Sequence, residues 1–124
     1  MASDGTYVYV ANGADDTISK ILIATGTADS SFSVSSGSCP DELTVSADNQ
    51  TLFVSETCDN TLIRVNLNTL NYDFVSVGTT PDGLATDGSF VWVANEDDNT
   101  VSKIDLTSFT VVATIAVGNT PKDI

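Results

Sequence analysis

The sequence predicts an all-β protein, a β-propeller with three four-stranded blades in its 124 residues. First, a motif of about 41 residues occurs three times, and self-similarity at such a period is typical of propellers and solenoids, whose units bury their apolar faces only against one another. Second, turn-forming residues recur at intervals of roughly 8–12 positions, as in all-β folds with short strands. Third, no segment keeps an apolar period of about 3.6 residues, so no helix is expected.

The third repeat shows each element most clearly. A first strand follows Pro81 and ends at Asp87 and Gly88, a dipeptide that favours a hairpin turn. The second strand is dense in β-branched and aromatic side chains, which favour extended backbone, and the polar segment 96–99 forms the loop after it. The four strands and the connection to the next unit are expected at residues 82–86, 90–94, 100–106, 110–117 and 118–121.

The other two repeats follow the same plan. The second begins at Pro40, turns at Asp48 and closes over residues 74–78. The first is the least regular, because its last turn, 24–29, is longer and its fourth strand, 31–37, is rich in serine. The whole chain therefore reads as one domain, a half-propeller over residues 1–124 with approximate repeats at 1–39, 40–80 and 81–124.

The repeat is interrupted within a strand at the two ends of the chain. Residues 121–124 match 81–84, and residues 2–5 match 85–88. Unpaired strand edges favour aggregation, and head-to-tail association of identical chains removes them. Because closed propellers commonly have four to eight blades, we expect a homodimer with a six-bladed ring rather than a nine-bladed trimer. The alternative is that the segment is a piece of a longer tandem array.

Charge restricts the partners. Seventeen acidic residues face four basic ones, for a net charge of −13. Nucleic acids and anionic membrane surfaces attract Lys and Arg, so neither is an expected partner. The charge is compatible with a cationic ligand, with divalent cations, or with solubility alone. No stretch approaches the roughly 18 apolar residues of a membrane span, and residues 1–5 lack the features of a signal peptide, as would those of a mature secreted protein.

Several segments of the third repeat closely resemble the YVTN-type β-propeller repeat of archaeal and bacterial surface-layer and secreted proteins. They are residues 91–95, 98–105, 110–115 and 117–118. The second repeat departs from the family with Ser55 and Glu56 where the family has Ala and Asn. The resemblance implies an extracellular or cell-surface scaffold, usually with about seven blades. Streptogramin lyases are similar in repeat pattern but use a catalytic histidine, and this chain contains none.

Two sets of aspartates are candidate binding residues. Asp41 and Asp82 follow the prolines that start the innermost strands, and Asp123 lies one step further on, so all three are expected near the mouth of the central channel, where the field of like charges concentrates. A second set lies in the loops after the second strands and comprises Asp15, Asp59 and Asp98. Their oxygens suit Ca²⁺, but the spacing of a dedicated calcium loop is missing, and Asp also favours tight turns.

Two cysteines fall at equivalent ends of neighbouring strands. Cys39 precedes the innermost strand of the second blade, and Cys58 follows its second strand. Because these strands are antiparallel neighbours, a disulfide is geometrically reasonable and would indicate an oxidising compartment, whereas two free thiols remain the alternative. Zinc is not expected, since two Cys and no His cannot supply four ligands.

Two further sets of residues occupy one position in every repeat. The aromatic set comprises Tyr9, Phe53 and Trp92. We expect these side chains to fill the space between blades or, alternatively, to stack against a ligand. The basic set comprises Lys20, Arg64 and Lys103. We expect these side chains to pair with carboxylates such as that of Asp105 or, alternatively, to bind an anion.

No pairing of a nucleophile with a base stands out, so the sequence predicts a protein that is not an enzyme and needs no cofactor: a non-catalytic, self-assembling scaffold and binding module. Its expected partners are itself and a cationic, protein or glycan ligand. The alternative function is a propeller hydrolase whose carboxylates act on a glycan at the channel mouth, since a pair of carboxylates suffices for that chemistry.

Overall fold

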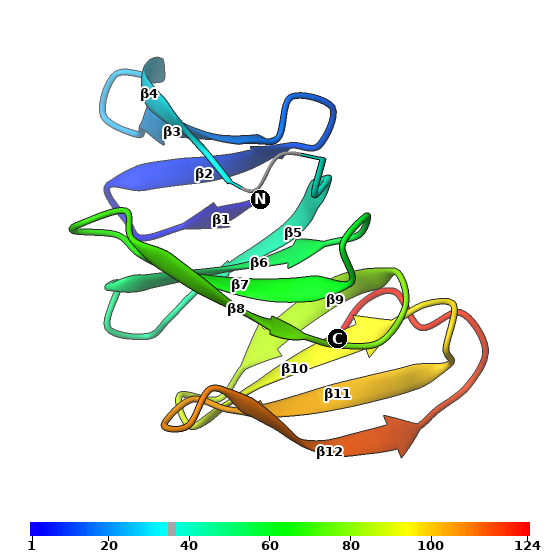
Figure 1. Ribbon diagram of the computed structural model, residues 1–124. Coiled ribbons are helices and arrows are strands. Elements are labelled where there is room, and N and C mark those ends of the chain that lie inside the picture. The colour runs from blue at the N-terminus through cyan, green and yellow to red at the C-terminus, as the bar shows by residue number, and fades with distance from the viewer. Residues whose placement is uncertain (35–36) are drawn as a thin grey trace.

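The computed structural model describes residues 1–34 and 37–124 and contains three four-stranded antiparallel sheets, one for each repeat (Figure 1). In each sheet the strands lie in chain order, as in a propeller blade. The first sheet consists of β1 (Ala2–Ser3), β2 (Tyr7–Asn12), β3 (Thr17–Leu22) and β4 (Thr27–Ser33). The second consists of β5 (Pro40–Val45), β6 (Thr51–Glu56), β7 (Thr61–Asn66) and β8 (Tyr72–Ser76). The third consists of β9 (Pro81–Thr86), β10 (Phe90–Asn95), β11 (Thr100–Asp105) and β12 (Thr110–Ala116).

The predicted fold class and the three blades are confirmed. No helix occurs in the described parts of the chain, and a half-propeller of this kind is compatible with closure by dimerisation. No helix that could span a membrane was found in residues 1–34 or 37–124.

Local turn chemistry sets the register of the hairpins. Gly88 adopts a φ of 90°, which favours glycine, and the Asp87 carboxylate accepts hydrogen bonds from the backbone N–H groups of Ser89 (2.9 Å) and Phe90 (2.8 Å). These hydrogen bonds lower the pKa of Asp87, because they stabilise its ionised form. The turn aligns β9 with β10 so that Ala85 lies opposite Trp92.

The first blade differs from its prediction at the fourth strand. We expected this strand at residues 31–37, but β4 spans Thr27–Ser33, and residues 35–36 lie outside the described residues. The preceding turn is as tight as in the other blades, because Gly26 adopts a φ of 67° where Leu70 and Phe109 have 61° and 50°. β4 therefore begins and ends earlier in the sequence than expected.

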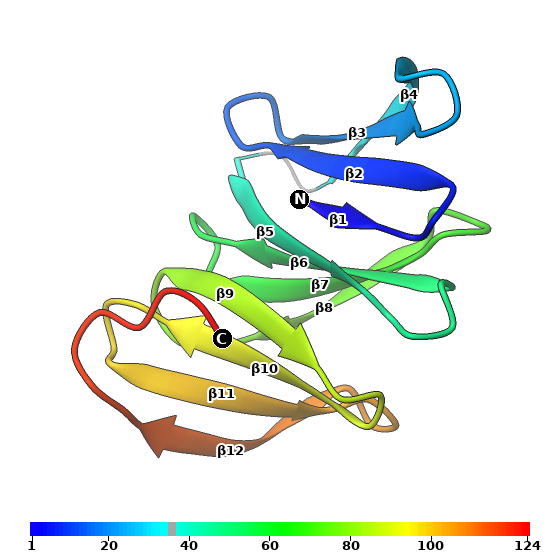
Figure 2. The ribbon, with the colours of Figure 1, turned by 180° about the vertical axis from the view of Figure 1, so that it is seen from behind.

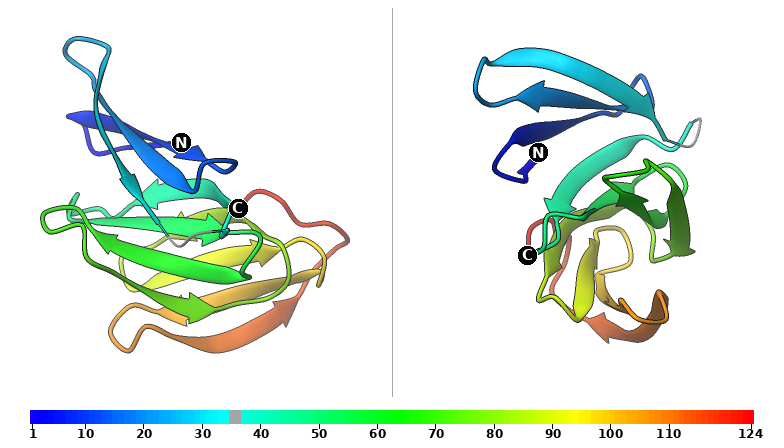
Figure 3. Two further views of the ribbon diagram at one scale, coloured as in Figure 1. Left: turned by 45° about the horizontal axis from the view of Figure 1, so that its top comes forward. Right: turned by 90° about the vertical axis from the view of Figure 1, so that its left-hand side faces the viewer.

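Apolar side chains between neighbouring sheets form two cores. The core between the first and second sheets includes Tyr9, Ile18, Leu52, Val54 and Ile63. The core between the second and third sheets includes Phe53, Leu62, Val91, Val93 and Ile104. Side chains alternate between the two faces of a strand, so the second sheet, in the middle, contributes to both cores (Figure 3).

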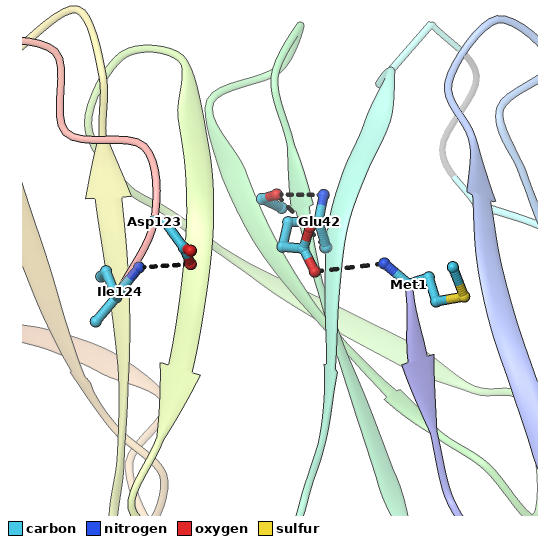
Figure 4. Close-up of polar contacts among 5 residues, drawn as sticks. Met1, Glu42, Asp123 and Ile124 are labelled. Carbon is cyan, nitrogen blue, oxygen red and sulfur yellow. Dashed lines mark hydrogen bonds and ion pairs between the residues drawn. The ribbon is translucent and has the colours of Figure 1, made fainter.

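The innermost strands β1, β5 and β9 lie side by side, and the C-terminal segment after β12 lies next to β9 in this row (Figure 2). The backbone N–H of Gly83 in β9 donates a 2.6 Å hydrogen bond to the carbonyl of Lys122, so this segment reaches the inner edge of the third blade. A side chain at Gly83 would collide with the Lys122 backbone, which explains the glycine. The two termini lie at opposite ends of this row of strands (Figure 4).

Candidate functional site

The inner strands bring two of the predicted channel-mouth aspartates into each other's field. Burial raises the pKa of Asp82 above its usual value, the negative charge of Asp41 raises it further, and Lys122 opposes both effects. Asp41 and Asp123 are exposed, whereas Asp82 is partly buried. The inner edge of β5 and β9 is therefore an electronegative surface, on which the carboxyl group of Asp82 has a raised pKa.

Two positive groups compensate part of this charge. The N-terminal amine lies 3.4 Å from Glu42 Oε1, and the Lys122 ammonium lies 2.9 Å from Glu96 Oε1. The carboxylate of Asp123 accepts a 2.9 Å hydrogen bond from the backbone N–H of Ile124 (Figure 4). Both compensating groups come from residues at the ends of the chain.

The loop aspartates do not assemble into a metal site. In the described part of the chain, no three Asp, Glu or Cys side chains are gathered so that they could hold one metal ion. Asp15, Asp59 and Asp98 are all exposed. Asp98 holds the connection into its own blade, because its Oδ2 accepts a 2.7 Å hydrogen bond from the backbone N–H of Thr79.

A structural role of the next residue in each loop was missed by the sequence analysis. Asp16, Asn60 and Asn99 all adopt a positive φ, between 53° and 58°, at the start of the third strand. Each side chain accepts a hydrogen bond from the connection that leaves the same blade: Asp16 from Cys39 N (3.1 Å), Asn60 from Thr80 N (2.9 Å) and Asn99 from Thr120 N (2.8 Å). The recurrence of Asp or Asn before Thr in every repeat was the available signal.

Cys39 and Cys58 form a disulfide with their Cα atoms 5.4 Å apart. It joins the connection that precedes β5 to the loop that follows β6, as the antiparallel placement of these strands predicted. Such a bond is consistent with an oxidising environment.

Two members of the aromatic set fill the space between blades, as predicted, and the third does not. Tyr9 and Phe53 are 2% and 1% exposed and belong to the two inter-sheet cores. The Tyr9 hydroxyl donates a 2.8 Å hydrogen bond to Asp4, and burial together with this carboxylate raises the pKa of the phenol. Trp92, on the third sheet, is only partly buried.

The predicted carboxylate pairing of the basic set holds as an ion pair for one member, while the charges of the other two, Lys20 and Lys103, only contribute to lowering the pKa of Asp4 and of Asp105. Lys20 and Lys103 lie over aromatic rings of their own blades, with their Nζ atoms 3.7 Å from the Tyr7 centroid and 3.8 Å from the Phe90 centroid. Arg64 alone pairs with a carboxylate, that of Asp73, at 2.6 Å. An adjacent aromatic face attracts a cation as a carboxylate does, which the position in the repeat did not reveal.

The two outer faces of the three-blade arc are incompletely covered. Val91, Val93 and Ile104, which face the preceding blade, are fully buried. Their equivalents in the first blade, Val8, Val10 and Ile21, have no preceding blade and are only partly buried. On the opposite side of the arc the exposed side chains of the third blade include Ile115 (42%) and Val117 (41%).

Comparisons with known proteins support the fold. No protein-family model and no curated protein matches the sequence. Similar solved structures include hydrazine synthase of Kuenenia stuttgartiensis (TM-score 0.88, 19% identity, 99% of this chain and 36% of that chain). Virginiamycin B lyase of Staphylococcus aureus is another, with a TM-score of 0.82, 17% identity and coverage of 99% of this chain and 43% of that chain. A putative 6-phosphogluconolactonase of Bacteroides fragilis matches with a TM-score of 0.85, 18% identity and coverage of 99% of this chain and 39% of that chain. These structures are propeller-like, and the chain spans 36–43% of their length.

These matches correct the expectation that the chain is not an enzyme. That expectation rested on the lack of histidine and of an evident nucleophile with its base. The matched structures are named as a synthase, a lyase and a putative lactonase, so the three-blade architecture occurs in enzymes. At these identities the likeness shows the fold alone.

Proposed function

We propose that the chain is a self-assembling β-propeller and binding module, in which two copies associate head to tail into a six-bladed ring. The observation that carries the proposal is the difference in burial between equivalent apolar residues inside the arc and at its two ends. The sequence and the fold make these two ends complementary, because they repeat the two faces that already pack against each other within the chain.

The contact between the second and third blades is the template for the contact between copies. There, Phe53, Leu62 and Val75 of the second blade pack against the third. Their equivalents on the third blade face outwards: Trp92 and Val101 are only partly buried, and Ile115 is exposed. Burying them against the partly buried Val8, Val10 and Ile21 of a second copy would contribute the usual roughly 25 cal/mol per Å² of apolar surface.

The ring also supports the proposal of a cationic ligand. Asp41 and Asp82 lie on the inner strands β5 and β9, and Asp123 lies in the C-terminal segment, so closure would direct these residues of both copies towards one channel. A low-dielectric rim with carboxylates of like charge attracts cations and cationic groups of a protein or glycan. Burial is the main cause of the raised pKa of Asp82, and the negative charge of Asp41 adds to it, as such a potential requires.

The YVTN-type resemblance and the Cys39–Cys58 disulfide together favour an extracellular or cell-surface protein. The resemblance is carried by residues 91–95 and 98–105, which form β10, the loop after it and β11. We therefore place the chain with the YVTN-type repeats as part of this proposal.

A second candidate function is carboxylate catalysis on a glycan at the same mouth. It is favoured by one observation: burial and the nearby charge of Asp41 raise the pKa of Asp82, and a carboxyl group with a raised pKa is suited to act as a general acid. Hydrolysis of a glycan panel that is lost in both Asp41→Asn and Asp82→Asn would support this function, and turnover that survives both substitutions would exclude these residues.

The test of assembly is absolute mass by size exclusion with light scattering over a range of concentrations. We expect a species at twice the chain mass of 12.9 kDa. Ile115→Lys should convert it to monomer, because Ile115 lies on the outward face of β12. Thr114→Lys is the matched control, since its side chain points to the other face of the same strand. A wild-type chain that stays at 12.9 kDa at every concentration would overturn the proposal.

A further inference from the structure

We propose that the connection after β12, residues 117–121, is a preformed docking element that binds the loop after β2, residues 12–16, of a second copy. The inference rests on the proposed head-to-tail assembly and assigns the residues that hold it together. It also assigns residues 121–124 as the missing half of the strand that begins the first blade.

The docking element already has the conformation of a connection between blades. Thr120 adopts a φ of 50°, as Thr80 and Cys39 do at 53° in the two internal connections. Val117 N donates a 3.0 Å hydrogen bond to the carbonyl of Asn99, and Val77 N donates one of the same length to the carbonyl of Asn60. Residues 117–121 also match 77–81 at all but one position. The segment is therefore shaped for a following blade before one is bound.

The third blade shows how such a connection is received. Asn95 Oδ1 accepts a 3.0 Å hydrogen bond from Gly78 N, and the N–H of Glu96 donates a 2.9 Å hydrogen bond to the carbonyl of Thr80. Asp98 Oδ2 accepts from Thr79 N at 2.7 Å. These contacts hold the incoming connection on the loop that follows β10.

The loop of the first blade carries the same receiving groups. Asn12 is oriented as Asn95 is: its amide nitrogen donates to Thr17 Oγ1 (3.1 Å) and Ser19 Oγ (2.8 Å), at the positions of Thr100 and Ser102. Within the described residues, no donor reaches Asn12 Oδ1. We assign Gly118 N of the second copy as its donor. By the same equivalence Asp15 receives Asn119 N, and Gly13 N donates to the carbonyl of Thr120.

Glycine at position 118 supports this assignment. A Cβ on Gly78 would lie 2.5 Å from Asn95 Cγ, so Gly78 is required by the packing of the connection on the asparagine. A Cβ on Gly118 would meet nothing within 4 Å in its own chain, and its φ is not positive. Nothing inside the chain calls for this glycine, whereas docking on Asn12 of a second copy does.

The strand that completes the first blade follows from the register of the third. Leu84 lies opposite Val93 and Pro81 opposite Asn95, whereas β1 covers only the positions opposite Val8 and Tyr9. The second copy's Ile124 is therefore placed opposite Val10, and its Pro121 opposite Asn12. The strand then reads across the two copies as 121–124 followed by 2–3.

The disulfide of the second blade provides a test at atomic resolution. Cys39 and Cys58 occupy the positions of Thr120 and Ala14, so Thr120 of one copy should lie beside Ala14 of the other at a similar Cα separation, 5.4 Å. The variant Ala14→Cys with Thr120→Cys should therefore oxidise to a covalent dimer with two bridges and no titratable thiol. Mixing the two single variants should give a heterodimer with one bridge. Ala14→Cys with Thr107→Cys is the position control, because Thr107 is exposed on the opposite turn.

The outcomes separate this inference from the proposed assembly. A dimer by light scattering that does not cross-link through positions 14 and 120 overturns the docking assignment and leaves the assembly intact. A monomer overturns both. Cross-linked ladders beyond two chains support the docking contact and contradict the two-chain ring.

A second variant tests the glycine without new cysteines. Gly118→Ala should raise the dimer dissociation constant about tenfold or more, because the added methyl would collide with Asn12 of the second copy. Its unfolding midpoint below the association range should match wild type. An unchanged dissociation constant would contradict the docking of Gly118 on Asn12.

Discussion

Thr80 Oγ1 donates a 2.6 Å hydrogen bond to Asp97 Oδ2 at the repeat position where the preceding blade has its disulfide. Both pairs join the connection that enters a blade to the loop after its second strand. The fold therefore requires proximity at this point and tolerates either a covalent bond or a hydrogen bond. The loops are held by a common backbone arrangement, to which each repeat adds its own side-chain contact.

The first prediction is that a second disulfide can replace this hydrogen bond. Thr80→Cys with Asp97→Cys should oxidise spontaneously, because the two positions are equivalent to Cys39 and Cys58. Closing a loop of this length raises the free energy of unfolding by about 3 kcal/mol, and loss of the hydrogen bond lowers it by about 1 kcal/mol. We therefore expect a net increase in the free energy of unfolding of about 2 kcal/mol. Thiol titration and denaturant unfolding, with the reduced protein as control, measure both quantities. Free thiols in the folded protein would contradict the equivalence.

The second prediction concerns the buried contact of the second connection. Gly78→Ala should lower the free energy of unfolding by about 2–3 kcal/mol, because its methyl group would lie 2.5 Å from Asn95 Cγ and displace a side chain that is fully buried. Urea unfolding below the association range measures the change, and Gly118→Ala is the matched control, because Gly118 occupies the equivalent position in the connection after β12. Equal stability of the two variants would show that the connection shifts without cost.

The third prediction is that Glu56→Gln raises the stability of the folded protein by an amount that depends on pH. Glu56 is 1% exposed, and burial raises its pKa above the ordinary value of 4.5. Its Oε2 accepts a 2.6 Å hydrogen bond from Thr61, while Oε1 has no partner within the described residues. Between pH 4.5 and the raised folded pKa the unfolded chain has lost the proton and the native chain keeps it, so wild-type stability falls as pH rises through this window.

Glutamine keeps the acceptor for Thr61 and carries no charge. Glu56→Gln should therefore be more stable than wild type at pH 7, by about 1 kcal/mol, and the difference should shrink as the pH falls towards 4.5. Thermal unfolding at a series of pH values measures it, with the exposed Asp29→Asn as control. A difference that does not change with pH would show that Glu56 stays ionised at no cost.

The fourth prediction is that Arg64 links two blades through its planar guanidinium. Its Nε and Nη2 atoms bind Asp73 at 3.0 and 2.6 Å, and Nη1 donates to the Leu106 carbonyl of the next blade at 3.2 Å. Its Cζ lies 4.0 Å from the Phe109 ring centroid. Arg64→Lys keeps the charge but cannot form this set of contacts.

We expect Arg64→Lys to lower the free energy of unfolding by only about 1 kcal/mol, since the site is partly exposed and solvent weakens the ion pair. A double-mutant cycle with Phe109→Leu isolates the stacking contribution, and urea unfolding is the measurement. Additive effects of the two substitutions would show that the guanidinium and the ring do not interact.

Much of the fold could be predicted because its signals are local. The Asp87–Gly88 turn and the apolar alternation of residues 90–94 specify a hairpin without reference to the rest of the chain. The fourth strand of the first blade was predicted too late, because the polar residues 24–29 resemble a long turn, although β4 already begins at Thr27. The positions of Lys20 and Lys103 were found, but their aromatic partners were not, since a cation on a strand can turn to either neighbour.

Local patterns were sufficient to establish the number of repeats, the order of the strands, the acidic character of the inner edge and the match between residues 121–124 and 81–84. These properties can be read from the sequence because each depends on residues within one repeat or on the comparison of equivalent positions between repeats. Three-dimensional packing was needed to find that Asp82 is partly buried near Asp41 and that Asn12 repeats the geometry of Asn95. The same holds for the incomplete covering of the outer faces at Val8 and Ile115. Burial and hydrogen bonding depend on which neighbour lies across from a residue, and that neighbour belongs to another repeat.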